Sequence, residues 1–449
     1  MISVINKSMF RAYDIRGIYG SDLTENVMEA VGNAFASLFV KDSVVVGMDG
    51  RISSPQLRKA FITGVLKAGK DVTDVGLVPR SACLFAAWKS GKPSAYITAS
   101  HLPPEWNGVK FAHGNGVEFF EEDNNKIRDA VLSGKAVEAQ EKGSVNTLDA
   151  IESYKKYILS RMPEVERPLR VVLDCGNGTA GLAAPDIFRA MGFEVKTLFS
   201  EVDGRFPNRP SEISESALQK LSEEMKNADM GIAYDGDADR MSLMDEKGRI
   251  LGPETSAYII LGMLAVHEKG PIVANVECLK IMDEVAEKYK RRLYRIRVGN
   301  SFMVHEVNAR KACFGVERSG HFCLPSVMPM DDGIAASAYA AAALSAKGRK
   351  LSEIVDELPH YPFVRHKVEC PDEKKFAVIN RLKEKLSGKY QRVNTIDGVR
   401  VDLDYGWVLI RASNTEPVIR LSAEADNKKN LKELANEFLE ALKNEIKSS

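Results

Sequence analysis

The sequence predicts an α/β protein with three similar α/β domains of mixed, largely parallel sheet and a C-terminal α+β domain. Two observations lead to this fold class. An apolar strand, a turn, an amphipathic helix and a second strand recur three times, and such alternation favours parallel sheets covered by helices. After about Tyr361 the order of elements changes. We therefore place the domains at 1–148, 149–252, 253–362 and 363–449.

The first unit begins with an apolar strand at residues 43–48. Its helix has Pro55 in the first turn and Gly69 at the end, which are the helix positions that these residues favour. A later strand, 94–97, runs into the polar loop 98–101.

The second unit repeats this order. A strand at 170–174 is followed by a helix at about 182–191 and a strand at 194–199. A further strand, 230–234, runs into the acidic segment 235–240.

The third unit has a strand at 271–276, a helix at about 280–291 and a strand at 292–298. Its later strand, 312–315, runs into the polar loop 316–321.

The fourth region has a helix at about 373–386, strands within 391–404 and at 407–411, and a final helix at about 428–446. Its polar loop, 411–417, again follows a strand. Since ligands of α/β sheets bind beyond the carboxyl ends of strands, the four polar loops are the candidate functional segments.

The acidic segment carries Asp235, Asp237 and Asp239 at alternate positions, with Arg240 directly behind them. Three like charges on one tight turn repel each other, and Mg²⁺ is a cation that such carboxylates bind, often together with phosphate. A solvated acidic turn is one alternative. An EF-hand is another, with Glu246 as its last ligand, but the glycine that an EF-hand turn needs is Arg240 here.

Ser100 precedes His101, and neighbours on an extended chain point to opposite faces. The sequence also lacks the Gly-x-Ser-x-Gly turn of an α/β-hydrolase. A serine that carries a phosphoryl group fits this loop better, with Lys110 and Arg16 as nearby cations. An ordinary loop serine beside a surface histidine is the alternative.

The segment 176–181 matches the pattern Gly-x-Gly-x-x-Gly between a strand and a helix. Glu201 and Asp203 follow where a ribose-binding acid would lie. This favours a different class, a dinucleotide-dependent oxidoreductase, although one such match is weak.

Two further loops are rich in polar groups. Arginine suits phosphate because its planar guanidinium donates two parallel hydrogen bonds, and carboxylates and hydroxyls suit sugars. The last-domain loop offers Arg411, Ser413, Asn414, Thr415 and Arg420. The third-domain loop offers Glu317, Ser319 and His321.

Together these loops resemble the α-D-phosphohexomutase family over nearly the whole chain. Residues 98–101 are similar to its phosphoserine loop, 235–240 to its metal loop and 317–321 to its sugar-recognition loop. Residues 411–415 are similar to its phosphate-binding loop, and 10–17 match its N-terminal signature.

The resemblance implies four domains around a central cleft and a mutase that interconverts hexose 1-phosphate and hexose 6-phosphate. It implies phosphoserine at Ser100, Mg²⁺ as cofactor and a hexose 1,6-bisphosphate as intermediate and activator. The implied metal ligands are Ser100, Asp235, Asp237 and Asp239. The implied catalytic residues are Ser100, His101, Lys110, Arg16, Arg240 and His321. The implied substrate-binding residues are Tyr13, Glu317, Ser319, Arg411, Ser413, Asn414, Thr415 and Arg420.

Within the family, residues 331–334, 206–208 and 411–417 resemble the phosphomannomutase/phosphoglucomutase branch. Phosphoglucosamine mutase is the alternative. Leu102 and Asn300 depart from residues that many members carry, so mannose, glucose and glucosamine all stay open as substrates.

The composition limits the kinds of partner. The chain has 62 basic and 62 acidic residues, which does not favour nucleic acid or an anionic membrane surface as a partner. The most apolar stretches, 258–266 and 334–346, are too short to span a bilayer. The six cysteines are scattered, which favours a reduced, cytoplasmic protein. Both a monomer and a homo-oligomer stay open.

Overall fold

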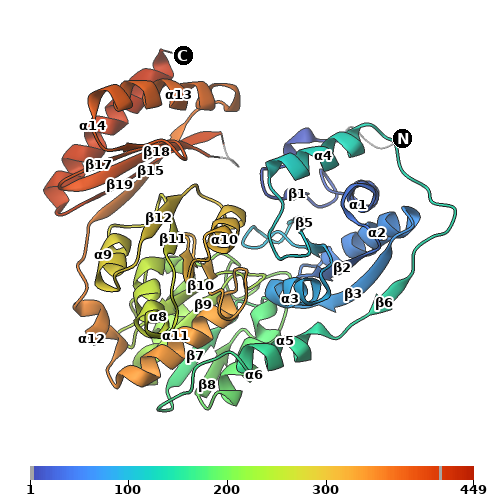
Figure 1. Cartoon of the computed structure of the whole chain (residues 1–449), viewed down its shortest axis with the longest axis horizontal. Coiled ribbons are helices and arrows are strands. Elements are labelled where there is room, and N and C mark those ends of the chain that lie inside the picture. The colour runs from blue at the N-terminus through green and yellow to red at the C-terminus, as the bar shows by residue number, and fades with distance from the viewer. Residues whose placement is uncertain (1–4, 414–416, 449) are drawn as a thin grey trace.

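A computed structural model describes residues 5–413 and 417–448. Four domains follow one another along an arc, with the first and the last domain at its two ends (Figure 1). Three carry mixed sheets flanked by helices and the fourth carries an antiparallel sheet, which confirms the predicted fold class. The boundaries at 148/149, 252/253 and 362/363 stay predictions.

The first domain contains a sheet with the strand order β1-β5-β4-β2-β3-β6. Strands β4, β2, β3 and β6 run parallel, whereas β5 is antiparallel to both of its neighbours, β4 and the edge strand β1. The predicted strands at 43–48 and 94–97 are confirmed as β2 and β4. The elements are β1 Ile15–Ile18, α1 Glu25–Phe39, β2 Ser43–Met48, α2 Ser54–Lys67, β3 Asp71–Leu77, α3 Arg80–Ser90, β4 Ser94–Ile97, β5 Trp106–Ala112, α4 Glu121–Leu132 and β6 Val145–Thr147.

The second domain has the strand order β10-β9-β7-β8, with β10 antiparallel to β9. The predicted helix at 182–191 is shorter than expected: a 3₁₀ turn at Thr179–Leu182 precedes α6, which has a proline in its first turn. Gly181 packs against the Ser200 carbonyl, which fixes this turn before the helix begins. The elements are α5 Ala150–Leu159, β7 Arg170–Asp174, α6 Ala184–Ala190, β8 Glu194–Leu198, α7 Gln219–Glu224, β9 Met230–Tyr234 and β10 Met241–Met244.

The third domain has the strand order β12-β11-β13-β14, and only the pair β13–β14 is antiparallel among its described strands. Both apolar stretches noted in the sequence form helices, α8 and α11. The elements are α8 Pro253–His267, β11 Ile272–Asn275, α9 Ile281–Lys288, β12 Leu293–Ile296, α10 Asn300–Ala309, β13 Phe314–Val316, β14 Phe322–Cys323, α11 Gly333–Lys347 and α12 Leu351–Asp356.

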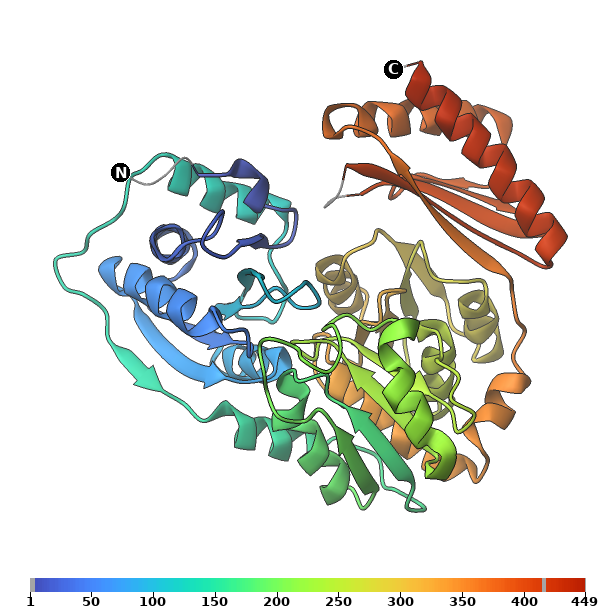
Figure 2. The same ribbon diagram turned by 180° about the vertical axis from the view of Figure 1, so that it is seen from behind.

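The fourth domain has an antiparallel sheet with the order β15-β19-β18-β17-β16. Its two long helices cover one face of the sheet, as Figure 2 shows. The elements are β15 Phe363–Glu369, α13 Asp372–Lys389, β16 Val393–Asn394, β17 Val399–Leu403, β18 Gly406–Ala412, β19 Val418–Ala425 and α14 Lys428–Lys447.

One hydrophobic core joins the first three domains. Helix α11 lies against β9 and β10 as well as against α8, so the third-domain helix also covers the second sheet. The first and fourth domains each have a further core of their own. This shared core holds the loops after β4, β9 and β13 in fixed relative positions.

Candidate active site

Ser100 lies in the turn that follows β4. The side chain is buried, and Ser100 Oγ donates a hydrogen bond of 2.9 Å to Asp235 Oδ2 of the second domain. The backbone φ of Ser100 is 52°, a left-handed conformation that few serines adopt. His101 Nδ1 lies 3.4 Å from Ser100 Oγ. The structure therefore brings the predicted serine loop and the predicted acidic loop together.

The acidic loop joins β9 to β10. Oxygens of Asp235, Asp237 and Asp239 lie within 4.8 Å of one another, and all three side chains are buried. The solvated-turn alternative is therefore wrong. Antiparallel strands flank the loop, and Glu246 binds Ser352 instead of turning back to the carboxylates, so the EF-hand alternative is also wrong.

These carboxylates fit a divalent cation. Asp237 Oδ1 and Asp239 Oδ1 are buried and have no hydrogen-bond partner among the described residues. Buried carboxylate oxygens without partners are costly unless a cation compensates them, and oxygen ligands are those that Mg²⁺ takes. The loop is a candidate metal site.

The electrostatic environment differs between the carboxylates of the acidic loop. Burial and the carboxylates of Asp239 and Asp237 raise the pKa of Asp235 well above its ordinary value. Burial acts in the same direction on Asp239, but Lys110 and the other surrounding cations outweigh it and hold the Asp239 pKa well below its ordinary value. Lys110 Nζ lies 2.7 Å from Asp239 Oδ2 and 3.4 Å from Asp237 Oδ2.

Two predicted catalytic residues bind each other. Arg240 Nε donates to His321 Nε2 at 2.9 Å, and His321 Nδ1 lies 2.8 Å from Asp331 Oδ2. Asp331 thus favours a proton on Nδ1, which leaves Nε2 free to accept from Arg240. The Arg240 guanidinium, followed by burial, lowers the pKa of His101 well below its usual value.

Arg80 is a site residue that the sequence analysis missed. It is buried at the start of α3, and its guanidinium lies 3.3 Å from Asp239 and 3.2 Å from Asp331. It also pairs with Glu118. In the sequence, Arg80 is only an arginine at the start of an apolar segment. Its neighbours in the chain do not indicate that it contacts carboxylates of two other domains.

The site opens into a cavity of about 720 Å³ that all four domains line. Most predicted side chains reach its wall: Tyr13, Arg16, His101, Lys110, Asp235, Arg240, Glu317, Ser319, His321, Arg411 and Arg420. Ser100, Asp237 and Asp239 are buried and are absent from the described lining. Ser413 is also buried away from this wall, and Asn414 and Thr415 lie outside the described residues.

Glu317 has one oxygen fixed by the protein. Glu317 Oε1 accepts from Asn275 Nδ2 at 2.9 Å and from the Gly299 backbone N–H at 2.8 Å. Ser319 Oγ lies 3.4 Å from Oε2, at the limit of a hydrogen bond. The Oε2 atom is therefore the better placed of the two to accept from a ligand.

The fourth domain contributes a basic wall. Arg411 and Arg365 both lie near Glu277, at 3.6 Å and 3.2 Å. Burial would raise the Glu277 pKa, but these arginines outweigh it and lower that pKa below its ordinary value. Arg365 and Lys367 of β15 and Glu277 after β11 line the same cavity and were missed, because neither segment carries a recognisable motif.

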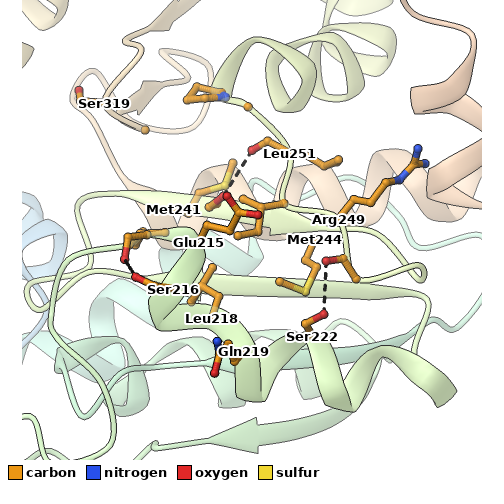
Figure 3. A pocket seen from close by; sticks show the side chains of 18 of the residues that line it. Glu215, Ser216, Leu218, Gln219, Ser222, Met241, Met244, Arg249, Leu251 and Ser319 are labelled. Carbon is orange, nitrogen blue, oxygen red and sulfur yellow. Dashed lines mark hydrogen bonds between the residues drawn. The ribbon is translucent and has the colours of Figure 1, made fainter. Parts of the chain in front are cut away.

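A second cavity of about 1260 Å³ adjoins the first (Figure 3). Leu218, Met241, Met244 and Leu251 of the second domain line it, and Ser319 reaches it from the third-domain loop. Its described lining contains none of the predicted catalytic or metal-binding residues, so we place the active site in the smaller cavity.

The glycines at 176–181 pack against protein. A Cβ at Gly176 would lie 2.5 Å from Arg209 Nη2, and one at Gly178 would lie 2.7 Å from the Gly236 carbonyl oxygen. These glycines let the loop approach the acidic segment closely. Protein atoms thus occupy the space that a pyrophosphate would need there.

Comparison with known proteins agrees with this fold. The chain matches the descriptions "Phosphoglucomutase/phosphomannomutase, alpha/beta/alpha domain" I at residues 7–138, II at 149–248 and III at 252–361. Residues 366–441 match the C-terminal domain of the same family.

Relatives of similar length carry two kinds of name. A probable phosphoglucosamine mutase of Methanopyrus kandleri is 35% identical over 97% of both chains. A phosphomannomutase/phosphoglucomutase of Pseudomonas aeruginosa is 34% identical over 97% of this chain and 96% of its own. A solved structure of a phosphoglucomutase/phosphomannomutase family protein from Burkholderia thailandensis is 30% identical, covers 98% of both chains and has a TM-score of 0.90.

The fold and the site thus define an enzyme that transfers phosphoryl groups within sugar phosphates. The chain belongs to the α-D-phosphohexomutase family, whose members are intramolecular phosphotransferases. This membership excludes the dinucleotide-dependent oxidoreductase. Among the residues that the structure describes, no helix combines the length and apolar character needed to cross a membrane.

Proposed function

We propose that the chain interconverts hexose 1-phosphate and hexose 6-phosphate through phosphoserine at Ser100 and a hexose 1,6-bisphosphate. One observation carries this proposal: Ser100 Oγ lies 2.9 Å from Asp235 Oδ2, beside two further buried carboxylates. A serine held against carboxylates that suit Mg²⁺ is placed for phosphoryl transfer.

The metal in this proposal is Mg²⁺, held by Asp235, Asp237 and Asp239 with Ser100 or its phosphate as a further ligand. When bound, the cation draws charge from the transferring phosphoryl group. The protein adds fixed cations around the same group: Lys110, Arg240 and Arg16, which all line the cavity. His321 acts on Arg240, because Nε2 accepts from its guanidinium and so orients it.

The reaction has two balanced transfers. In the first, a sugar hydroxyl attacks the phosphoserine phosphorus, the P–O bond to Ser100 Oγ breaks, and the proton of the attacking hydroxyl is transferred overall to the released Ser100 Oγ. In the return step, Ser100 Oγ loses its proton and attacks the other phosphorus, the P–O bond to the sugar oxygen breaks, and a proton is transferred to that sugar oxygen. Asp235 Oδ2 at 2.9 Å and His101 Nδ1 at 3.4 Å are the acceptors within reach of Ser100 Oγ.

The bound sugar spans the cavity in this proposal. Arg411, Ser413, Asn414, Thr415 and Arg420 hold the phosphate that is not reacting. Glu317, Ser319 and Tyr13 hold sugar hydroxyls. The bisphosphate must turn over within the cleft between the two transfers, so the fourth-domain loop accepts phosphate in both orientations of the sugar.

For the sugar we propose mannose and glucose, because residues 331–334 and 411–417 resemble the phosphomannomutase/phosphoglucomutase branch. Glucosamine is the second candidate, because relatives at 35% and 34% identity include proteins named phosphoglucosamine mutase. We propose a cytoplasmic location, since all six cysteines are free and buried.

A side-by-side assay tests this function. Mannose, glucose and glucosamine 1-phosphates are compared with Mg²⁺ and a hexose 1,6-bisphosphate present. We expect turnover of the first two, and none with the Ser100→Ala variant. A preference for glucosamine 1-phosphate would overturn the choice of sugar, and near-normal activity of the variant would overturn the phosphoserine.

Metal dependence is tested with the Asp237→Asn variant. We expect a higher Mg²⁺ concentration for half-maximal activity, because one of the three carboxylate charges is gone. Asp186→Asn, on an exposed ion pair of the same domain, is the matched control and should leave the Mg²⁺ dependence unchanged. Equal Mg²⁺ dependence of both variants would contradict the assigned metal ligands.

A further inference from the structure

Each of the three α/β domains carries a polar residue at the end of its first central parallel strand. Asp49 directly follows β2, Asp174 ends β7 and Asn275 ends β11. In each case the side-chain Oδ1 accepts from the backbone N–H two residues further on, at 3.0, 2.9 and 3.1 Å. This shared turn fixes the start of the following loop.

Each of these strands is the parallel neighbour of the strand that leads into a functional loop. The pairs are β2 with β4, β7 with β9 and β11 with β13. Because carboxyl ends of neighbouring parallel strands lie side by side, the polar residue of one strand is within reach of the functional loop of the next.

In the first domain the contact runs through Arg51. Its Nε donates to Asp49 at 3.0 Å, and its two terminal nitrogens donate to four backbone carbonyls between Ser100 and the start of β5. These carbonyls belong to Ser100, Leu102, Pro103 and Trp106, at 2.8, 2.6, 2.6 and 3.0 Å. All five guanidinium N–H groups are thus used, so Arg51 has no donor left for a phosphate.

The backbone N–H of Ser100 is held as well. It donates to Thr98 Oγ1 at 2.7 Å, and Thr98 Oγ1 donates to Asp49 Oδ2 at 2.8 Å. Asp49 and Arg51 therefore hold the nucleophile from its amide side and from its carbonyl side. A serine at φ 52° needs such restraint, because this conformation persists only where its surroundings fix it.

The second domain has a similar arrangement of an aspartate and an arginine. Arg209 Nε donates to Asp174 Oδ1 at 2.9 Å, and Arg209 Nη2 donates at 2.7 Å to the carbonyl of Tyr234, the residue before the acidic loop. Arg209 is buried and also bonds the Pro210 carbonyl.

In the third domain the contact is direct. Asn275 Nδ2 donates at 2.9 Å to Glu317 Oε1 in the sugar loop. The fixed turn leaves the amide nitrogen pointing at this carboxylate, since Asn275 Oδ1 accepts from the Glu277 and Cys278 backbone N–H groups.

We propose that Asp49 with Arg51, Asp174 with Arg209, and Asn275 are positioning residues that set the three functional loops of the active site. This rests on the function proposed above for those loops. Each residue acts on a different loop, so each should alter a different kinetic quantity.

The test compares Arg51→Lys and Asn275→Asp with matched controls. A lysine cannot span four carbonyls, so the Ser100 loop loses its fixed position: we expect kcat to fall about 10- to 100-fold with KM for the hexose phosphate nearly unchanged. A carboxylate at 275 repels Glu317, so KM should rise about tenfold with a smaller change in kcat. A purely structural role would not produce this split.

The controls are Arg58→Lys on α2 and Asn33→Asp on α1, which lie within the first domain and contact Asp74 and the Gly64 carbonyl. Both should keep the wild-type kcat and KM. The proposal is overturned if Arg51→Lys behaves as Arg58→Lys does, or if Asn275→Asp leaves KM unchanged. If the Arg51→Lys variant does not fold, the KM of the Asn275→Asp variant tests the proposal. Turnover by the wild-type protein tests the proposed function and is measured first. A failure of the proposed function is therefore distinguished from a failure of the positioning proposal.

Discussion

The backbone conformation and the position of Ser100 depend on contacts with other residues. The left-handed backbone costs a serine about 1–3 kcal/mol, and Thr98 and Arg51 hold it from both sides. The side chain contacts the acidic loop because Gly236 allows close approach: a Cβ there would lie 2.7 Å from the Ser100 carbonyl oxygen.

Asp332 gives a residue-scale prediction of pH dependence. Burial raises the pKa of Asp332 to about 6, although Tyr154, Ser81 and the first turn of α11 donate to it. Because the folded pKa lies above the unfolded one, the stability from this group is complete below about pH 4 and is lost as pH rises through about 6.

The Asp332→Asn variant removes this titration and keeps Oδ1 for the helix cap. Relative to the variant, we expect the wild-type free energy of unfolding to fall by about 1 kcal/mol between about pH 5 and pH 7.5. Urea denaturation at the two pH values measures it. A difference between the two proteins that does not change with pH would contradict the assignment.

Some site residues could be predicted from the sequence and others could not. Ser100 and the three carboxylates stand directly after apolar strands, and chain position alone indicates that they belong to the candidate site. Arg51 and Arg80 act on residues far away in the chain, so only the packed structure reveals their partners. Ser413 carried the same local signal as Arg411 but is buried away from the described cavity wall.

At the scale of elements, helices α1 and α2 cross at two glycines. A Cβ at Gly64 would lie 2.0 Å from the Glu29 carbonyl oxygen, and one at Gly32 would lie 2.2 Å from the Phe61 carbonyl oxygen. Both contacts are with backbone, which cannot move aside as a side chain can.

We therefore expect Gly64→Ala to lower the free energy of unfolding by about 1–3 kcal/mol. Gly388→Ala in α13 is the control, because a Cβ there meets nothing within 4 Å. Removing a helical glycine there should raise stability by up to about 1 kcal/mol. Thermal unfolding of both variants shows whether each substitution raises or lowers stability. A Gly64→Ala variant that is more stable than the wild type would contradict the close contact between α1 and α2.

The accuracy of the predicted bounds differed from element to element. The strand predicted at 312–315 lies at Phe314–Val316, whereas the helix predicted at about 428–446 lies at Lys428–Lys447. The predicted bounds of β2, β4 and β9 are confirmed because each strand is a short apolar run bounded by polar residues. The predicted helix at 182–191 begins later, since tertiary packing of Gly181 against Ser200 sets a 3₁₀ turn there. Local sequence does not contain that contact.

At the scale of the whole molecule, buried charges join the first three domains. Arg80 of α3 lies among Glu118 of its own domain, Asp239 after β9 and Asp331 after β14. Coulomb attraction outweighs burial and raises the Arg80 pKa further, so its charge is permanent. The three domains are thus held together at the active site itself.

Arg80→Met tests this connection. Removing one partner leaves buried carboxylates uncompensated, so we expect a loss of about 3–5 kcal/mol. Arg58→Met, which breaks a half-buried pair with Asp74 inside the first domain, should cost about 1 kcal/mol or less. The two variants are compared by their midpoints of thermal unfolding. Equal shifts of the two midpoints would contradict the conclusion that Arg80 holds the three domains together.

The central claim is that phosphate on Ser100 is the group that the enzyme transfers. The most direct measurement is a single turnover: purified phosphoenzyme is mixed with glucose 6-phosphate, quenched at intervals, and analysed for phosphate at Ser100 and for hexose 1,6-bisphosphate. We predict that phosphate leaves Ser100 and appears in the bisphosphate at least as fast as steady-state turnover. Turnover while the phosphate stays on Ser100 would contradict the claim.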